Sequence, residues 1–221
     1  MRPAIVALHG KGDNGPSFAQ GTGLLLADAT VAAPTGAGLA WAPAPYAHTT
    51  LEEDAARIDA IVDSLIRDHG ADPERIYLTG FSNGGGLAVS LTLLSDRFAG
   101  VATVAAAVRA TPDAIAAGPR PVDYLNIHGT WDDVVPYAGE ARSPYSGMAG
   151  VGTDPTFGAA EVTEAFRVRN GGSARAEHIA VERMGHEWRP GTTGAILDFF
   201  GIELTGFPGP VSYTHLTLPT I

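Results

Sequence analysis

Three residue types that can together perform nucleophilic catalysis occur along this chain in the order serine, aspartate, histidine. Ser82 is the central residue of GFSNG at positions 80–84, which matches the pattern G-x-S-x-G. A serine hydroxyl is a weak nucleophile, so it needs a base within hydrogen-bond distance, and the base needs a carboxylate that fixes its tautomer. The pattern therefore predicts Ser82 as a nucleophile that depends on an acid and a histidine from other parts of the chain.

The acid and the histidine are expected in two later loops. Residues 122–127 are expected to form a strand that leads into HGTWDD, so Asp132 and Asp133 both follow the expected end of that strand. A second run, residues 176–181, leads into ERMGHEW, which places His186 before the last expected helix. Because the carboxyl ends of parallel strands meet at one edge of a sheet, both loops are expected to reach Ser82. At this point either aspartate fits.

Ester or amide chemistry at Ser82 also requires two N–H groups that stabilise the oxyanion. One is expected from Asn83, directly after the nucleophile. The other is expected from the loop HGKGD at residues 9–13, where the amide of Lys11 is the first choice and that of Gly12 the alternative. His9 is interpreted as a residue that orients this loop and takes no part in the reaction.

The serine needs a strand before it and a helix after it. Residues 76–79 form a short apolar run typical of a buried strand, and residues 87–94 are apolar on most faces of a helix. Strand, tight turn and helix are the context of a nucleophile elbow. The glycines at both flanks of the serine leave room for this turn, and the amino end of the helix directs free N–H groups at developing negative charge.

The remaining pattern alternates strands and helices. Thr50 and Glu53 form an expected capping box for a helix over Leu51–His69, which Gly70 closes. We expect further strands at residues 4–8, 31–34, 101–108, 122–127 and 176–181, and further helices at residues 159–169 and 191–200. This alternation predicts an α/β fold with a mainly parallel sheet and helices on both faces.

Composition limits the classes of function. The 221 residues, 45% of them hydrophobic, suit one α/β domain, which we place at residues 1–210. The net charge of −10 argues against nucleic acids or anionic membranes as partners. The sequence has no cysteine, and we recognise neither a signal peptide nor an apolar run of 18 residues, so a cytoplasmic location is expected.

The last residues, 211–221, read VSYTHLTLPTI and lack a helical period. They resemble the translation of a sequencing adapter, an artefact of metagenomic assemblies. We therefore interpret them as a non-native tail, with a short native strand as the alternative, and give His215 no catalytic role.

Aromatic residues fall in or beside the motif loops and are expected to line a pocket for an acyl or aryl group, although ordinary packing explains each of them equally well. These candidate substrate-binding residues are Trp41, Phe81, Trp131, Tyr137 and Trp188. The Gly-, Pro- and Ser-rich residues 137–157 suggest an excursion or lid on the substrate side. His48, His69 and His178 lack spaced partners, so no metal is expected, and the expected chemistry needs no cofactor.

Four motifs in order carry a resemblance to a known family. GADPERIYLTGFSNGG, followed by SDRFAGVATVAA, resembles the poly(3-hydroxybutyrate) depolymerase and feruloyl or acetylxylan esterase group of α/β-hydrolases. NIHGTWDDVVPY is similar to its acid loop, MGHEWRP to its histidine loop and LHGKGDN to its oxyanion loop. The resemblance covers residues 4–200. It implies a compact α/β-hydrolase fold with Ser82 as nucleophile, Asp132 in preference to Asp133 as acid, and His186 as base.

The departures from this group limit what is carried over. Its secreted members have signal peptides and disulfides, it often has Cys or Thr where Lys11 stands, and the present chain begins at what would be the third strand of a full sheet. The compact form is also similar to small carboxylesterases and acyl-protein thioesterases. We expect a serine hydrolase of carboxylic esters, either small molecules or polymers such as polyesters and aryl- or acetyl-polysaccharides. A thioester or small-peptide hydrolase and a non-catalytic binding protein are the alternatives.

Overall fold

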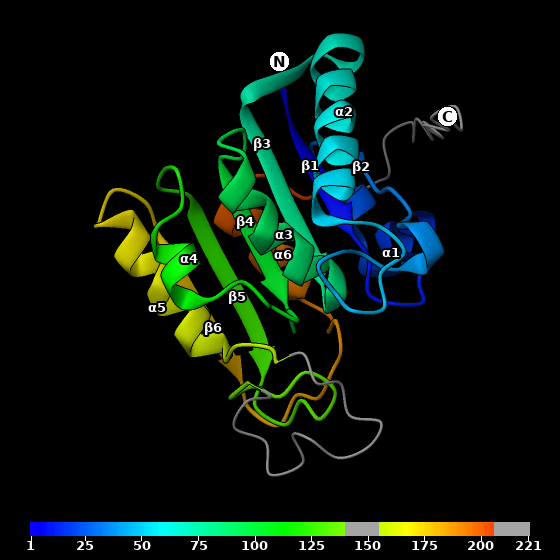
Figure 1. Ribbon diagram of the computed structural model, residues 1–221. Coiled ribbons are helices and arrows are strands. Elements are labelled where there is room, and N and C mark those ends of the chain that lie inside the picture. Colours follow the sequence, from blue (N-terminus) through cyan, green and yellow to red (C-terminus); the bar gives the residue numbers. More distant parts are fainter. Residues whose placement is uncertain (140–154, 206–221) are drawn as a thin grey trace.

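The computed structural model describes residues 1–139 and 155–205, whose strands form one sheet in which all neighbours are parallel. The strand order is β2-β1-β3-β4-β5-β6 (Figure 1). The strands are β1 (Arg2–Leu8), β2 (Thr30–Ala32), β3 (Ala71–Phe81), β4 (Gly100–Val104), β5 (Asp123–Gly129) and β6 (Ala176–Val181). The parallel sheet predicted from the sequence is therefore present.

Helices cover both faces of this sheet (Figure 1). They are α1 (Gly15–Thr22), α2 (Leu51–His69), α3 (Asn83–Leu94), α4 (Pro112–Ala116), α5 (Ala159–Asn170) and α6 (Thr192–Phe200). Alternate side chains of β1 point to opposite faces. Val6 and Leu8 join the core cluster that contains Ile58 of α2 and Leu87 of α3, whereas Ile5 joins the cluster built on α6.

Helix α2 begins and ends where the sequence predicts. Thr50 accepts a hydrogen bond from the amide of Glu53, and the Glu53 carboxylate accepts one from the amide of Thr50. Gly70 then adopts a left-handed conformation with φ of 65° and stops the helix. The capping box and the closing glycine are thus confirmed.

Strand β4 is shorter than predicted. Our expectation of a strand over residues 101–108 is wrong after Val104, because Ala105 has φ of 47° and turns the chain away from the sheet. The amide of Ala105 still donates to the carbonyl of Ile127 at 2.9 Å, but the amide of Ala107 donates to the carbonyl of Ser82 at 3.0 Å. The Val- and Ala-rich run therefore leaves the sheet to support the turn at Ser82.

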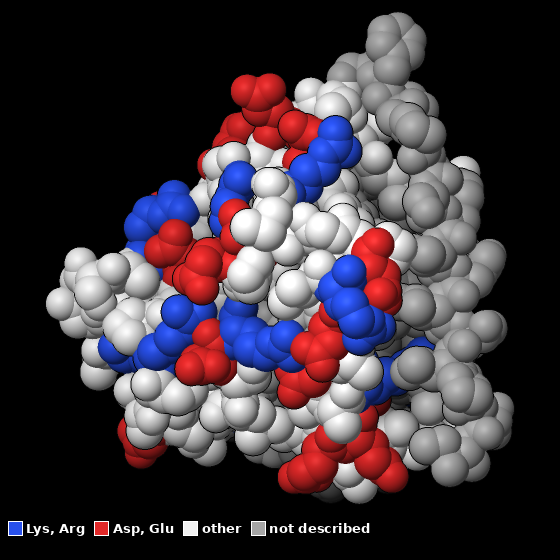
Figure 2. Space-filling model, turned by 90° about the horizontal axis from the view of Figure 1, so that it is seen from above, with Lys and Arg blue, Asp and Glu red and all other residues white. Residues whose placement is uncertain are grey.

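Charges of both signs are mixed on the surface. Seen from above, Asp and Glu residues lie beside Lys and Arg residues (Figure 2), and described pairs such as Arg67–Asp68 and Arg175–Asp123 approach to 2.7 Å. No helix within the described ranges is both long and apolar enough to cross a membrane. Most of the predicted excursion at residues 137–157, and the tail at residues 211–221, lie outside the described residues.

Candidate active site

Ser82 lies at the junction of β3 and α3 in a strained backbone conformation. Its φ is 54° and its ψ is −119°, a combination that non-glycine residues rarely adopt. Three backbone hydrogen bonds hold it there: the Ser82 amide donates to the carbonyl of Val104 at 2.9 Å, and the Ser82 carbonyl accepts from the amides of Gly86 and Ala107. The surrounding structure therefore over-determines the turn and keeps the serine at its tip.

The glycines of the motif are required by close backbone contacts. A Cβ atom on Gly80 would lie 2.5 Å from the carbonyl carbon of Gly84, and one on Gly84 would lie 2.3 Å from the carbonyl oxygen of Leu8. Both distances are shorter than the non-bonded contacts that Cβ atoms make in real proteins. A side chain at either position would push α3 away from the ends of β1 and β3 and displace the serine.

Asp132 is the acid that reaches the histidine. Its side chain is fully buried, and its Oδ1 accepts hydrogen bonds from the amides of Val134 and Val135 at 3.0 and 2.8 Å. Its Oδ2 accepts from Nδ1 of His186 at 2.9 Å. Asp133 is exposed, so the geometry separates the two aspartates that the spacing alone could not distinguish.

A second histidine also contacts this carboxylate. Nε2 of the buried His128 lies 3.1 Å from Oδ2 of Asp132 and 2.9 Å from the carbonyl oxygen of Val135. Both neighbours are acceptors, so Nε2 carries the proton. Burial alone would raise the pKa of Asp132, but hydrogen bonds from His128, His186 and the Val135 amide outweigh it and hold this pKa well below its usual range.

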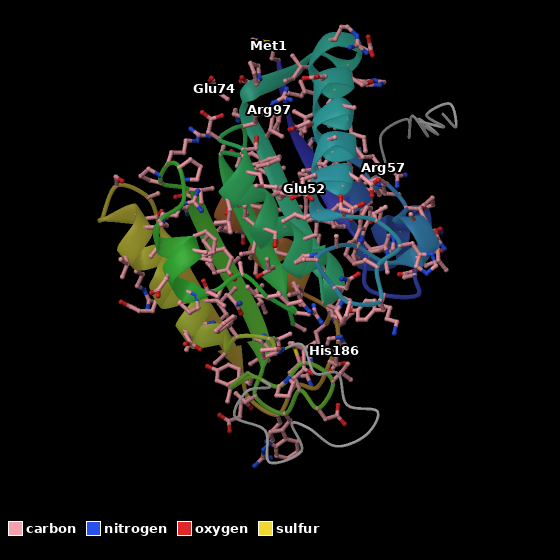
Figure 3. The ribbon with its side chains drawn as sticks, viewed as in Figure 1. Met1, Glu52, Arg57, Glu74, Arg97 and His186 are labelled. Atoms are coloured by element: carbon pink, nitrogen blue, oxygen red, sulfur yellow. The ribbon has the colours of Figure 1, made fainter. Side chains whose placement is uncertain are left out.

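His186 lies beyond the strand ends, at the opposite end of the molecule from Met1 (Figure 3). Its side chain is 14% exposed, and its ring packs against that of Phe81, the residue before the serine, with centroids 4.8 Å apart. Within residues 1–139 and 155–205, the Ser82 hydroxyl makes no hydrogen bond to His186. Such bonds are often long in free enzymes and tighten with substrate. The structure thus joins the acid to the histidine and brings the histidine against the residue next to the serine.

Backbone hydrogen bonds tie the acid loop to the histidine loop. The amide of Trp131 donates to the carbonyl of Met184 at 3.0 Å, and the amide of Arg183 donates to the hydroxyl of Thr130 at 3.0 Å. Residues more than 50 positions apart are therefore fixed as one unit. This arrangement explains how Asp132 can hold His186 in a single orientation.

The loop after β1 lies beside the serine, as the oxyanion prediction requires. A Cβ atom built on Gly10 would lie 3.5 Å from Cβ of Ser82. The amide of Gly12, the alternative donor, is already bonded to the carbonyl of Leu39 at 2.8 Å. Among the described residues, the amides of Lys11 and Asn83 have no backbone or side-chain acceptor, so these two remain the candidate oxyanion donors.

The placement of Trp41 contradicts its prediction as a substrate-binding residue. Its exposure is 0%, and it packs beneath the loop after β1. Its indole N–H donates to the carbonyl of His9 at 3.0 Å, and its backbone forms two hydrogen bonds with the side chain of Asn83. Trp41 therefore supports the site from below and has no surface to offer a substrate.

The other four aromatic candidates lie near the site with different exposure. Trp131 is 65% exposed beside Asp132, and Phe81 is half-buried against His186. Trp188 is half-buried and donates its N–H to the hydroxyl of Thr193, and the hydroxyl of Tyr137 lies 2.7 Å from Nε2 of His178. Their role in substrate binding stays a prediction.

His9 has the structural position that the sequence analysis favoured. It is fully buried; its Nε2 accepts from the amide of Gly36 at 2.9 Å, and its Nδ1 donates to the carbonyl of Gly10 at 2.7 Å. Burial lowers the pKa of this imidazole and keeps it neutral. Among the described residues, no group of three or more His, Asp or Glu side chains is arranged to hold a metal ion.

Two contributors to the site were not found from the sequence. One is His128, although its position four residues before Asp132, directly after the strand expected at residues 122–127, was visible. The other is the carboxamide of Asn83, which was considered only for its backbone amide. Both act through contacts between loops, which neither periodicity nor a local motif reveals.

A family profile and individual relatives of this chain are all described as esterases. The profile of the family described as "Esterase PHB depolymerase" matches residues 1–135. "Putative esterase NocK" of Nocardia uniformis is 35% identical over 201 residues, which cover 86% of this chain and 55% of that protein. "Feruloyl esterase C" of Emericella nidulans is 31% identical over 162 residues, or 69% of this chain and 57% of that protein. The chain thus spans about half the length of these relatives.

Solved structures show the same fold at low sequence identity. Esterase PE8 has a TM-score of 0.67 at 20% identity, covering 90% of this chain and 92% of that protein. SOBER1 of Arabidopsis thaliana has a TM-score of 0.63 at 19% identity, covering 91% and 98%. The predicted α/β-hydrolase fold is therefore confirmed, and the family match over more than half of the sequence shows that this chain belongs to the esterase PHB depolymerase family.

Proposed function

We propose that this protein hydrolyses carboxylic esters through an acyl-enzyme on Ser82, with His186 as general base and Asp132 as its carboxylate partner. The observation that carries the proposal is the 2.9 Å hydrogen bond between Asp132 and Nδ1 of His186, formed beside a serine in the strained conformation of a nucleophile elbow. The bond leaves Nε2 of His186 free to accept a proton, which is the role of the histidine in such triads.

The reaction divides into two balanced halves. The Ser82 oxygen attacks the ester carbonyl carbon while its proton passes to Nε2 of His186. The amides of Lys11 and Asn83 donate to the oxyanion; the bond to the alcohol oxygen then breaks, and His186 returns the proton to this leaving group. In the second half, water attacks the acyl group, His186 takes its proton, and the same proton restores the Ser82 hydroxyl as the acid departs.

The substrate is proposed to be a small or polymeric ester with an apolar or aryl acyl group. Phe81 packs against the imidazole of His186, and the indole of Trp131 is largely exposed next to the acid. Aromatic surfaces in these places suit a ring or alkyl chain lying beside the scissile carbonyl. The names of the feruloyl esterase relatives agree with this class of substrate.

Replacement of Ser82 tests the proposal. Hydrolysis of p-nitrophenyl acetate and butyrate, and labelling by a fluorophosphonate probe, are expected in the wild type and should both disappear in Ser82→Ala. The reason is that no other group supplies the acyl-enzyme oxygen. A matched control is Ser90→Ala on the same helix, whose hydroxyl bonds to the Gly86 carbonyl and should leave both readouts unchanged.

Two results would contradict the proposal. Wild-type turnover in Ser82→Ala, with circular dichroism showing a folded protein, would exclude the serine as nucleophile. Absence of labelling in the wild type would favour a non-catalytic binding protein with the same fold. A panel of thioester and peptide substrates would separate an esterase from the thioesterase and peptidase alternatives.

A further inference from the structure

Trp41 makes four contacts that connect the two sides of the proposed oxyanion hole. Its indole N–H donates to the carbonyl of His9 at 3.0 Å, and its ring lies 5.0 Å from that of His9. Its backbone N–H donates to Oδ1 of Asn83 at 2.8 Å, and its carbonyl accepts from Nδ2 of Asn83 at 2.9 Å. One buried residue therefore contacts both segments that carry the candidate donor amides.

These contacts fix the positions of the two amides relative to one another. His9 is two residues before Lys11 in the loop after β1, and Asn83 is the first residue of α3. β1 and β3 are adjacent strands, but their hydrogen-bonded register ends at the pair Leu8–Gly80. Beyond that pair, Trp41 is the one residue within the described ranges that forms hydrogen bonds with both the loop and the helix.

The segment that carries Trp41 is anchored in turn to α2. The amide of Ala42 donates to Oδ2 of Asp54 at 2.8 Å, and the hydroxyl of Thr49 donates to the same oxygen at 2.9 Å. Asp54 is 1% exposed on a helix with a complete capping box. The indole is therefore restrained from following a displaced His9 carbonyl, because the backbone of Trp41 is bonded to Asn83 and that of the next residue, Ala42, is bonded to Asp54.

We propose that Trp41 is a positioning residue that sets the distance between the oxyanion donors Lys11 and Asn83. The inference rests on the proposed function, since it concerns how the same site stabilises its transition state. Donor amides are effective only when both are aimed at the developing oxyanion before the reaction begins. Trp41 supplies this arrangement because it is hydrogen-bonded to both segments that carry the donors, and it does so without contacting the substrate.

Loss of the indole N–H should therefore affect the transition state more than substrate binding. Without it, the buried His9 carbonyl loses its hydrogen bond and the loop that carries Lys11 can move. Removing an entire oxyanion donor costs about 10²–10³-fold in kcat, so a displaced donor is expected to lower kcat/KM by about tenfold. Binding of uncharged ground-state analogues should change less than twofold, because Trp41 has no surface in contact with them.

The test removes the indole N–H of Trp41 while keeping an aromatic side chain at this position. Trp41→Phe is the simple variant, and incorporation of benzothienylalanine at position 41 keeps the shape of the indole and removes only the donor. Each protein is assayed with p-nitrophenyl butyrate and with a matched pair of inhibitors. The first inhibitor is an alkyl trifluoromethyl ketone, which adds to the serine and forms a tetrahedral oxyanion. The second is the corresponding methyl ketone. The inhibition constant of the first should rise in parallel with the loss of kcat/KM, and that of the second should stay constant.

A control separates positioning from general destabilisation. Tyr124→Phe also removes a buried hydrogen-bonding group, which contacts Thr103 and Asn126 within the sheet, and it should lower the melting temperature without changing either inhibition constant. Unchanged kcat/KM in the benzothienylalanine protein, or equal changes for both ketones, would overturn the inference. Failure of the proposed function would look different, because the wild type itself would show neither turnover nor labelling.

Discussion

The proposed site has two halves, and each contains a buried carboxylate with a different number of hydrogen bonds. In the acid–base half, Asp132 accepts from two amides through Oδ1 and lies within hydrogen-bond distance of two histidines through Oδ2. In the oxyanion half, Asp54 accepts only through Oδ2, from Ala42 and Thr49, while its Oδ1 has no partner among the described residues. The two side chains are buried to a similar extent, but Asp132 accepts more hydrogen bonds from protein groups than Asp54 does.

The difference appears in the direction of their pKa shifts. Burial raises the pKa of Asp54, and its two donors do not compensate, whereas hydrogen bonds from His128, His186 and the Val135 amide lower the pKa of Asp132 in spite of burial. The comparison teaches that the number of donors, more than depth, decides the direction in which the pKa of a buried carboxylate shifts. Asp132 is arranged to keep its charge beside the proposed catalytic histidine, and Asp54 serves to anchor a loop.

The largest effect is expected from breaking the acid–base half. In Asp132→Asn, the amide cannot hold His186 in the tautomer whose Nε2 accepts a proton, and the corresponding change in serine proteases lowers kcat about 10⁴-fold. We expect a loss of about 10³–10⁴-fold in kcat for p-nitrophenyl butyrate. Asp133→Asn is the matched control, because this neighbour is exposed and should keep its rate within twofold. Equal rates for the two variants would remove Asp132 from the mechanism.

The oxyanion half should break with a smaller effect, through Gly84→Ala. The added methyl group would meet the carbonyl oxygens of Leu8 and His9 at 2.3 and 2.5 Å, so α3 and the loop after β1 must separate. We expect a loss of about 1–3 kcal/mol in the free energy of unfolding, as for other overpacked cores, together with a lower kcat. Urea unfolding and esterase assays measure both quantities.

Gly194→Ala provides the contrast, because a Cβ there has no heavy atom within 4 Å and the residue lies inside α6. That variant should be neutral or up to about 1 kcal/mol more stable, since alanine favours a helix. If both glycine variants behaved alike, the contact between Gly84 and the end of β1 would have no energetic significance.

Much of the fold followed from local pattern. Alternating apolar runs and capped helices predicted the parallel sheet, and the limits of α2 and β6 agree with the structure to the residue. Helix α1 was missed because GPSFAQGT has low helix propensity, although Asn14 caps it and Pro16 occupies its first turn. Helix α4 was missed for its length, in spite of the cap by Thr111. In both cases the signal lay in the cap and not in the periodicity.

The site was less completely predictable. The order of the motifs placed Asp132 and His186 in loops that the structure joins by a hydrogen bond. The sequence could not show that Trp41 is buried or that His128 shares the carboxylate oxygen, because both facts depend on how loops from different strands pack. The sequence does not distinguish an aromatic residue near a motif that faces a substrate from one that is buried and supports the backbone.

The smallest effects concern the pH dependence of stability, where the two carboxylates should differ in sign. The pKa of Asp132 is lower in the folded state, so its contribution to stability is present above about pH 4, the ordinary value for an unfolded carboxyl. This contribution is lost as the pH falls below that value. Relative to the wild type, Asp132→Asn should therefore be most destabilised near neutral pH and lose part of this deficit in acid.

Asp54→Asn should show the opposite trend. The pKa of Asp54 is higher in the folded state, so the folded protein binds this proton more tightly than the unfolded chain, and ionisation destabilises the fold as the pH rises above about 4. The stability of Asp54→Asn relative to the wild type should therefore improve between pH 4 and neutrality. Urea unfolding of the three proteins across pH 3–7 measures both differences. If Asp132→Asn showed the trend expected of Asp54→Asn, burial and not the number of donors would govern the pKa of both carboxylates.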